Sequence, residues 1–162
     1  MVAAYLDIET TGLSRYWDEI TVIGVGLAKG SRIRIVQFFG EELARQSLVH
    51  ALKGASTIYT YNGSRFDLPF IEEYLGVDLT KMFEHHDLMY DCWDRGLYGG
   101  FKAVEEQLDI PRRLQGLHGL DAVLLWDKYK RAGDQEALDT LLEYNREDVS
   151  NLRALKTKLR IR

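Results

Sequence analysis

The chain has 162 residues, which is the usual length of one domain and enough to form a hydrophobic core without disulfide bonds or bound metal. Apolar residues make up 46% and charged residues 28% of the sequence, a composition that excludes a disordered chain. With 21 Lys and Arg against 25 Asp and Glu, the net charge of −4 excludes an overall basic field for a polyanionic partner. The single cysteine, Cys92, excludes a disulfide within the chain and a four-thiolate zinc site, and we expect it to fill a small apolar space.

The ends and linkers of the chain suggest a simple organisation. Residues 1–9 contain no basic region and too short an apolar run for a signal peptide, and no later stretch is long enough to span a bilayer. There is no internal repeat and no linker rich in Pro or Ser. We therefore expect one domain over residues 1–162, a cytoplasmic location and no membrane partner.

Three strands are predicted at the start. Residues Val2 to Glu9 are almost continuously apolar, which is typical of a strand buried on both faces. Residues 21–28 and 32–39 are rich in β-branched and aromatic side chains, and the Lys29-Gly30-Ser31 turn between them favours a hairpin. Three consecutive antiparallel strands follow from this pattern.

Helices and strands alternate in the rest of the sequence. Apolar spacing predicts helices over residues 41–52, 66–75, 101–108 and 120–131, a last helix that Asp134 caps and that runs to about Leu159, and strands over 57–61 and 86–89. The glycine-rich segment 96–119 is expected to form loops around one short helix. The fold class is therefore α/β, with a mixed five-stranded sheet flanked by helices on both faces.

Two acidic residues interrupt the first strand. Asp7 and Glu9 are two positions apart, so both side chains leave the same face of the strand. Burying unpaired carboxylates costs several kcal/mol each as an order of magnitude, and a cation is the usual remedy. The alternative is that the strand ends at Leu6 and the pair lies in solvent.

A third carboxylate lies within the apolar stripe of the last helix. The apolar residues of this helix recur at steps of three and four and form one stripe. Asp148 lies within that stripe, and Tyr144 lies one turn before it on the same stripe. The alternative is that Asp148 lies at the edge of the stripe and pairs with Arg146 or Arg153.

A fourth carboxylate, Asp67, falls where a helix follows a strand, with Pro69 in the first turn. Taken alone, it is interpreted as a helix-start residue, with Ser64 as the N-cap and Asp67 as its capping-box partner.

Three segments in this order resemble the motifs of one enzyme family. They are residues 7–13 (DIETTGL), 62–70 (NGSRFDLPF) and 144–148 (YNRED). Together they look like the exonuclease motifs of the DEDD (DnaQ-like) 3′–5′ exonuclease superfamily. The Tyr-x3-Asp third motif is similar to that of the DEDDy branch, and the second motif resembles that of the exonuclease domain of B-family DNA polymerases. The resemblance covers residues 1–155, loosely between the second and third motifs, and implies a ribonuclease-H-like fold.

The resemblance implies a two-metal 3′–5′ exonuclease that releases nucleoside 5′-monophosphates from the 3′ ends of single-stranded DNA or RNA. It makes Asp7, Glu9, Asp67 and Asp148 the ligands of two divalent ions. Oxygen ligands favour Mg²⁺ or Mn²⁺. Tyr144 completes the catalytic set by orienting the attacking water, because a phenol with a pKa of about 10 is a poor general base at neutral pH.

Other residues are expected to hold the nucleic acid. The resemblance implies that the last nucleotide is bound by Thr10, Thr11, Gly12, Leu13, Asn62 and Phe66. Lys102 could reach a phosphate, although a lone lysine at a helix start is more often solvated. The basic residues after Asp148 are either a backbone-binding stripe or a complement to the helix dipole.

Several further residues are interpreted as structural. His85 and His86 alternate across a strand and cannot both face one metal ion, and Asp87 is not counted as a ligand. Trp17 is more typical of a core or edge aromatic, but it follows the first motif closely enough to contact substrate.

Two other functions compete with the exonuclease. One is a catalytically silent relative that binds nucleic acid or a protein partner, which the intact set of carboxylates disfavours. The other is a two-metal endonuclease of the broader fold, which Tyr144 disfavours.

Overall fold

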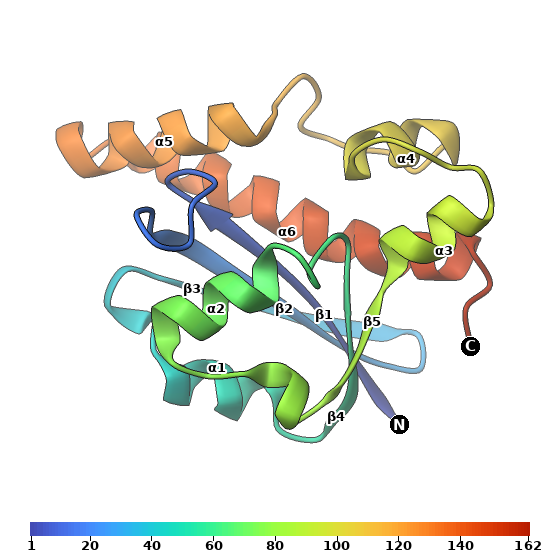
Figure 1. The fold of residues 1–162 in the computed structure, drawn as a ribbon. Helices are drawn as coiled ribbons and strands as arrows, with labels where there is room; N and C mark the ends of the chain where they lie inside the picture. The colour runs from blue at the N-terminus through green and yellow to red at the C-terminus, as the bar shows by residue number, and fades with distance from the viewer.

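The computed structural model describes all 162 residues, and a five-stranded sheet forms its centre (Figure 1). The strands are β1 (Val2–Thr10), β2 (Ile20–Lys29), β3 (Arg32–Phe39), β4 (Ala55–Thr60) and β5 (Glu84–Asp87), in the spatial order β3-β2-β1-β4-β5. β1, β2 and β3 pair antiparallel, whereas β4 is parallel to β1 and β5 is parallel to β4. The predicted mixed sheet is confirmed.

Helices cover both faces of this sheet, as predicted (Figure 1). One layer consists of α1 (Arg45–Leu52) and α2 (Asp67–Leu75), with short 3₁₀ turns η1 (Gly40–Glu42) and η2 (Leu79–Lys81). The other layer consists of α3 (Leu88–Asp94), α4 (Phe101–Gln107), α5 (Gly119–Ala132) and α6 (Gln135–Lys158). No helix combines the length and the hydrophobicity that crossing a bilayer requires.

The side chains of the central strand β1 pack against both helical layers. Leu6 and Ile8 are buried in the core cluster that includes side chains of α1 and α2. Tyr5 is buried in a second cluster, with side chains of α3, α4 and α6. Because successive side chains of a strand point to opposite faces, Asp7 and Glu9 lie on the same side as Tyr5. The strand therefore presents its two carboxylates toward α6.

The last helix begins as predicted and packs very close to the sheet. Gly133 adopts the left-handed conformation with φ of 64°, and the Asp134 side chain accepts a hydrogen bond from the N–H of Ala137 at 3.0 Å. On β2, Gly24 and Gly26 lie under α6, and a Cβ atom at either position would collide with a side chain of that helix.

Some predicted boundaries were wrong. The helix expected over 41–52 is divided into η1 and α1, and the last strand is β5 (Glu84–Asp87) because it pairs with β4 from Thr57 onward. Ser64 is not the N-cap of α2, which begins after Phe66. The Ser64 hydroxyl instead donates to Asp87 at 2.6 Å.

Candidate active site

Three carboxylates meet where the end of β1 passes under α6. Donor oxygens of Asp7, Glu9 and Asp148 all lie within 4.8 Å of one another. Glu9 and Asp148 are buried, and Asp7 is partly buried. The strand does not end at Leu6, because β1 continues to Thr10. The structure thus brings together carboxylates from opposite ends of the chain.

Asp67 lies beside this group, on the side of α2. β4 pairs with β1 only as far as Tyr5, so Ile8 lies opposite Ile23 on β2 but has no partner on β4. The Asp67 carboxylate accepts the N–H of Ile8 at 3.0 Å. Its oxygens are not in the group of three, but its negative charge acts on Asp7.

The crowding of buried acids changes their protonation. Burial raises the pKa of Asp7 to about 7, and the charge of Asp67 adds to this effect. Burial likewise raises the pKa of Asp67 to about 7, against the opposing hydrogen bond from Ile8. Burial and then the charge of Asp7 raise the pKa of Glu9 well above its ordinary value. Without a bound metal ion, these carboxyl groups therefore keep their protons up to a higher pH than ordinary carboxyl groups do.

Two side chains, Asn145 and Gln37, fix the position of the Asp7 side chain. The Asn145 amide on α6 donates to the carboxylate of Asp7 at 3.0 Å and to its backbone carbonyl at 3.2 Å. Gln37 on β3 donates to the Asn145 carbonyl oxygen at 2.9 Å, which orients the amide. Gly24, the partner of Asp7 on β2, leaves the space that Asn145 occupies. This arrangement holds one rotamer of the Asp7 side chain.

Two cations reach Asp148, and neither is the predicted partner. The ammonium of Lys102 lies 3.5 Å from a carboxylate oxygen of Asp148, and the guanidinium of Arg112 forms an ion pair with the same oxygen. Arg153, one of the expected partners, instead donates to the carbonyl of Gly30. Asp148 is therefore neutralised by α4 and by the loop that follows it.

Tyr144 is buried one turn before Asp148. The Lys102 ammonium lies 4.5 Å from the centre of its ring, and the Arg112 guanidinium carbon 5.6 Å. Burial raises the pKa of the Tyr144 phenol above its ordinary value of 10, although Lys102 opposes the shift. The phenol keeps its proton at neutral pH and can donate a hydrogen bond.

The loop after β1 is fixed by its own hydrogen bonds. The Thr10 hydroxyl donates to the carbonyl of Gly12 at 2.6 Å, and the Thr11 hydroxyl accepts the N–H of Glu19 at 2.9 Å. The carboxylate of Asp18 fills the space beside Gly12 that a Cβ atom would need. Leu13, at 88% exposure, is thereby held out into solvent.

The turn after β4 is fixed by Asp87. Asn62 adopts a left-handed conformation with φ of 60°, and its N–H donates to the Asp87 carboxylate at 2.8 Å. The N–H of Ser64 donates to the other oxygen of the same carboxylate at 3.0 Å. Asp87 therefore has a structural role at this turn and at the start of α3.

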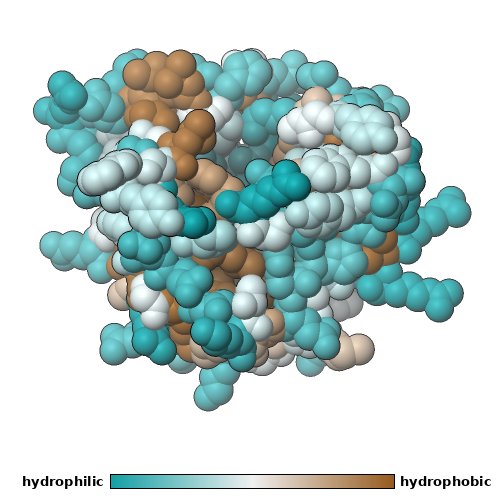
Figure 2. All heavy atoms as spheres, viewed as in Figure 1, coloured by the Kyte–Doolittle hydropathy of each residue, from teal (hydrophilic) through white to brown (hydrophobic).

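A small hollow of about 190 Å³ separates the loop after β1 from the start of α2. Its walls include Leu13 and Tyr16 on one side and Phe66 and Phe70 on the other. Trp17, in the same loop, is 88% exposed and is therefore not a core residue. Further apolar surface lies over α5, where Leu120 and Leu124 are exposed, at the upper left of Figure 2.

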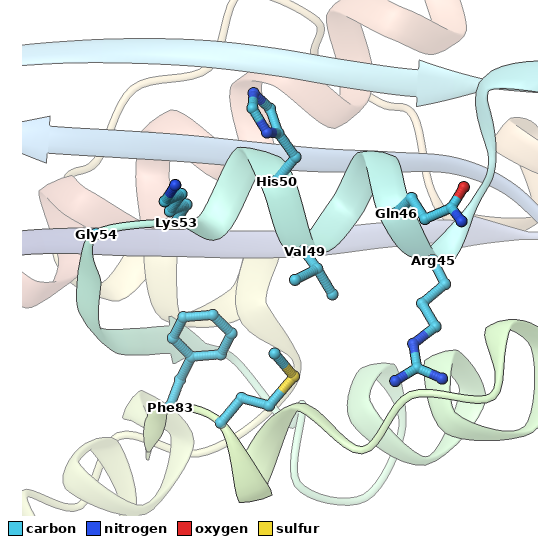
Figure 3. Close-up of a pocket in the computed structure, with 8 residues that line it drawn as sticks. Arg45, Gln46, Val49, His50, Lys53, Gly54 and Phe83 are labelled. Atoms are coloured by element: carbon cyan, nitrogen blue, oxygen red, sulfur yellow. The ribbon is translucent and has the colours of Figure 1, made fainter.

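A second hollow lies away from the carboxylates. It measures about 560 Å³, and its lining includes Arg45, Val49 and Lys53 with Phe83 (Figure 3). No acidic residue lines it. The carboxylate group is thus the better candidate for chemistry.

The residues at the carboxylate group fit a hard divalent cation. All donors are oxygens, which suits Mg²⁺ or Mn²⁺ rather than zinc. A buried oxygen of Glu9, Oε1, has no hydrogen-bond partner in the protein. An unsatisfied buried carboxylate oxygen is costly, and a bound cation would remove that cost.

The three motifs contain the five predicted site residues, and the structure places Asp7, Glu9 and Asp148 within 4.8 Å of one another, but the sequence did not point to the residues that support them. Asn145 and Glu147 lie inside the third motif, at positions where the Tyr-x3-Asp pattern specifies no residue type. Glu105 and Arg112 lie in the segment with the weakest pattern. A polar residue on the buried side of a helix was the available signal for Asn145, which is fully buried.

Comparison with known proteins agrees with this fold. Residues 4–160 match the family model of the RNase_H superfamily. No curated protein matches the sequence significantly.

Solved structures share the fold at low identity. The family B DNA polymerase from the hyperthermophilic archaeon Pyrobaculum calidifontis has a TM-score of 0.74 and 17% identity, over 98% of this chain and 24% of that one. Brucella melitensis NrnC has a TM-score of 0.59 and 22% identity, over 98% of this chain and 71% of that one. A nuclease in its apo form has a TM-score of 0.62 and 23% identity, over 97% of this chain and 70% of that one. The chain therefore spans about a quarter of the polymerase, and the ribonuclease-H-like fold implied by the three motifs is confirmed.

Proposed function

The chain belongs to the RNase_H superfamily, and from this premise we propose that it is a metal-dependent 3′–5′ exonuclease acting on single-stranded DNA or RNA. The observation that carries the proposal is the convergence of Asp7, Glu9 and Asp148 within 4.8 Å, with Asp67 beside them. A structural neighbour, Brucella melitensis NrnC, has been solved with bound pGG, which supports a nucleic-acid substrate.

In this proposal Asp7, Glu9, Asp67 and Asp148 hold two Mg²⁺ or Mn²⁺ ions. Bound ions of this kind stabilise charge on the scissile phosphate and lower the pKa of a water molecule. Tyr144, which keeps its proton, would orient the attacking water with its phenol. The protein's own contribution is to fix these groups in advance, as Asn145 does for Asp7.

The substrate-binding role belongs to the two fixed segments beside the carboxylates. Thr10, Thr11, Gly12 and Leu13 on one side, with Asn62 and Phe66 on the other, would hold the last nucleotide. Stacking of a base on exposed aromatic or apolar side chains contributes about 1–3 kcal/mol per base and tolerates any sequence. Lys102, beside Asp148, would contact the phosphate.

The test uses single-stranded DNA and RNA of one sequence, labelled at either end, with Mn²⁺, Mg²⁺ or EDTA. We expect a metal-dependent ladder that shortens from the 3′ end and that disappears in Asp148→Ala. Asp139→Asn, an exposed acid on the same helix, is the matched control and should cleave like the wild type. Substrate that is bound but intact in every lane would favour the catalytically silent alternative.

A further inference from the structure

A buried arginine pairs with a carboxylate that the proposed metal site needs. The Arg112 side chain is 10% exposed, and its Nη2 forms the ion pair with Asp148. Its Nε lies 3.2 and 2.9 Å from the two oxygens of Glu105. Both Nη atoms are buried and neither makes a hydrogen bond of normal geometry in the protein, so Nη2 meets Asp148 as an ion pair only. The Nε–H is therefore held by Glu105, while Nη2 lies against Asp148.

The anchor of this arginine is extensive. Asn151 on α6 donates to Glu105 at 2.5 Å and to the carbonyl of Pro111 at 3.2 Å. The buried Glu147 carboxylate accepts the N–H groups of residues 113 and 114, both at 2.8 Å. The backbone on either side of Arg112 is thus tied to α6. The ion pair of Arg112 with Glu105 is enough to join the loop to α4. The additional contact of Nη2 with Asp148 is not needed for that purpose.

The net charge of the site indicates what the Nη2 group of Arg112 does. Asp7, Glu9, Asp67, Asp148 and Glu105 together supply five negative charges, and Lys102 and Arg112 supply two positive ones. Two divalent ions would add four, so that one positive charge is left over. A phosphodiester carries one negative charge, and negative charge is stabilised by fixed donors as it develops in the transition state.

We propose that Arg112 has two alternative partners, Asp148 in the metal-free chain and the scissile phosphate when divalent ions are bound. Glu105 holds the Nε–H in both states, and only Nη2 changes partner. Arg112 thereby competes with metal ions for Asp148 and contributes a contact to the reacting phosphate. This inference rests on the proposed function, because the second partner is its substrate.

The test compares Mn²⁺ binding and turnover in Arg112→Gln and in the wild type. Calorimetric titration without nucleic acid should show about 3- to 10-fold tighter Mn²⁺ binding in the variant, because no arginine competes for Asp148. With saturating Mn²⁺, kcat should fall by about 10²-fold, because one fixed donor to the transition state is lost. Arg113→Gln is the matched control, since the Arg113 side chain is 88% exposed and lies 3.9 Å from Glu143. This control should leave both values unchanged.

The two opposite changes distinguish this role from a structural one. Thermal unfolding in EDTA shows whether Arg112→Gln is folded. A folded variant that binds Mn²⁺ no more tightly than the wild type overturns the competition. If Arg112→Gln does not fold, Arg112→Lys is measured instead. We expect it to bind Mn²⁺ more tightly than the wild type and to have at least 10-fold lower kcat, because one ammonium group cannot contact Glu105 and the phosphate at the same time.

Failure of the proposed function would be seen separately. A wild type that cleaves no substrate overturns both the exonuclease and the phosphate contact. The Mn²⁺ comparison still decides whether Arg112 competes for Asp148. A wild type that cleaves, beside an Arg112→Gln protein of unchanged kcat, overturns the phosphate contact alone.

Discussion

Asp7 and Asp67 hold their protons more tightly than ordinary aspartic acids, because burial raises the pKa of each to about 7. An unfolded chain releases the same protons near pH 4. Between about pH 4 and 7 the folded chain therefore binds more protons than the unfolded chain, and its free energy of unfolding falls as the pH rises. The stability that these two groups contribute is present at acidic pH and is lost above pH 7.

We accordingly expect the metal-free protein to unfold at a higher temperature at pH 5.5 than at pH 8. Asp7→Asn should reduce this difference, because it removes one of the two titrating groups. The measurement is thermal unfolding by circular dichroism in EDTA at several pH values. Asp139→Asn should keep the wild-type dependence, and a wild-type profile that rises toward pH 8 would contradict the prediction.

Asp7 and Asp148 should respond differently to the same substitution. Asp7 faces like charges, so Asp7→Asn is expected to raise the Tm of the metal-free protein. Asp148 is paired with Lys102 and Arg112, so Asp148→Asn leaves buried donors poorly satisfied and should cost about 1–3 kcal/mol. Both variants should lose cleavage. Equal changes in Tm, measured in EDTA, would show that the pairing of Asp148 contributes little to stability.

At the scale of elements, the contact of α6 with β2 depends on the absence of a side chain at Gly24. We expect Gly24→Ala to cost about 1–3 kcal/mol, because the added methyl group displaces Asn145. Mn²⁺ binding should weaken as well, since Asn145 holds Asp7. Urea unfolding and calorimetry measure the two effects. Gly119→Ala, with open space around its Cβ position, is the control and should be close to neutral.

The turn after β4 depends in the same way on one carboxylate. Asp87→Asn keeps the shape of the side chain but replaces one acceptor oxygen with a donor, so at least one N–H of the turn loses its partner. We expect a cost of about 1–3 kcal/mol and a KM that rises more than kcat falls, because Asn62 is proposed to bind substrate. Steady-state kinetics with a short oligonucleotide provide the readout. Asp94→Asn, at an exposed position on α3, is the control.

The elements that could be predicted are those whose signals are local. The boundary between α5 and α6 follows from Gly133 and Asp134, and β1 follows from its apolar run. The position of β5 could not be predicted, because pairing with β4 sets it. The same distinction applies to the site. Spacing made Tyr144 and Asp148 candidates, whereas the partners of Asp148 lie 36 and 46 positions away, in a segment whose residues show no clear periodicity.

At the scale of the whole molecule, bound metal should connect elements that the sequence separates. We expect saturating Mn²⁺, at about 100 times its Kd, to stabilise the fold by about 2.7 kcal/mol. For a chain of this size that corresponds to a rise in Tm of roughly 5–10 °C. Thermal unfolding with and without Mn²⁺ measures the shift, and Asp148→Ala should largely remove it. An equal shift in that variant would place the stabilising metal elsewhere.

The bond from Asn145 to Asp7 joins residues 138 positions apart and has a consequence for synthesis. β1 leaves the ribosome first among the elements of this fold, and α6 leaves it last. A nascent chain carries Asp7 and Glu9 from the beginning but acquires Asp148, Tyr144 and Asn145 only when α6 emerges. If the proposed function is correct, a nascent chain cannot cut nucleic acid before α6 has emerged, and this includes the messenger from which it is being translated.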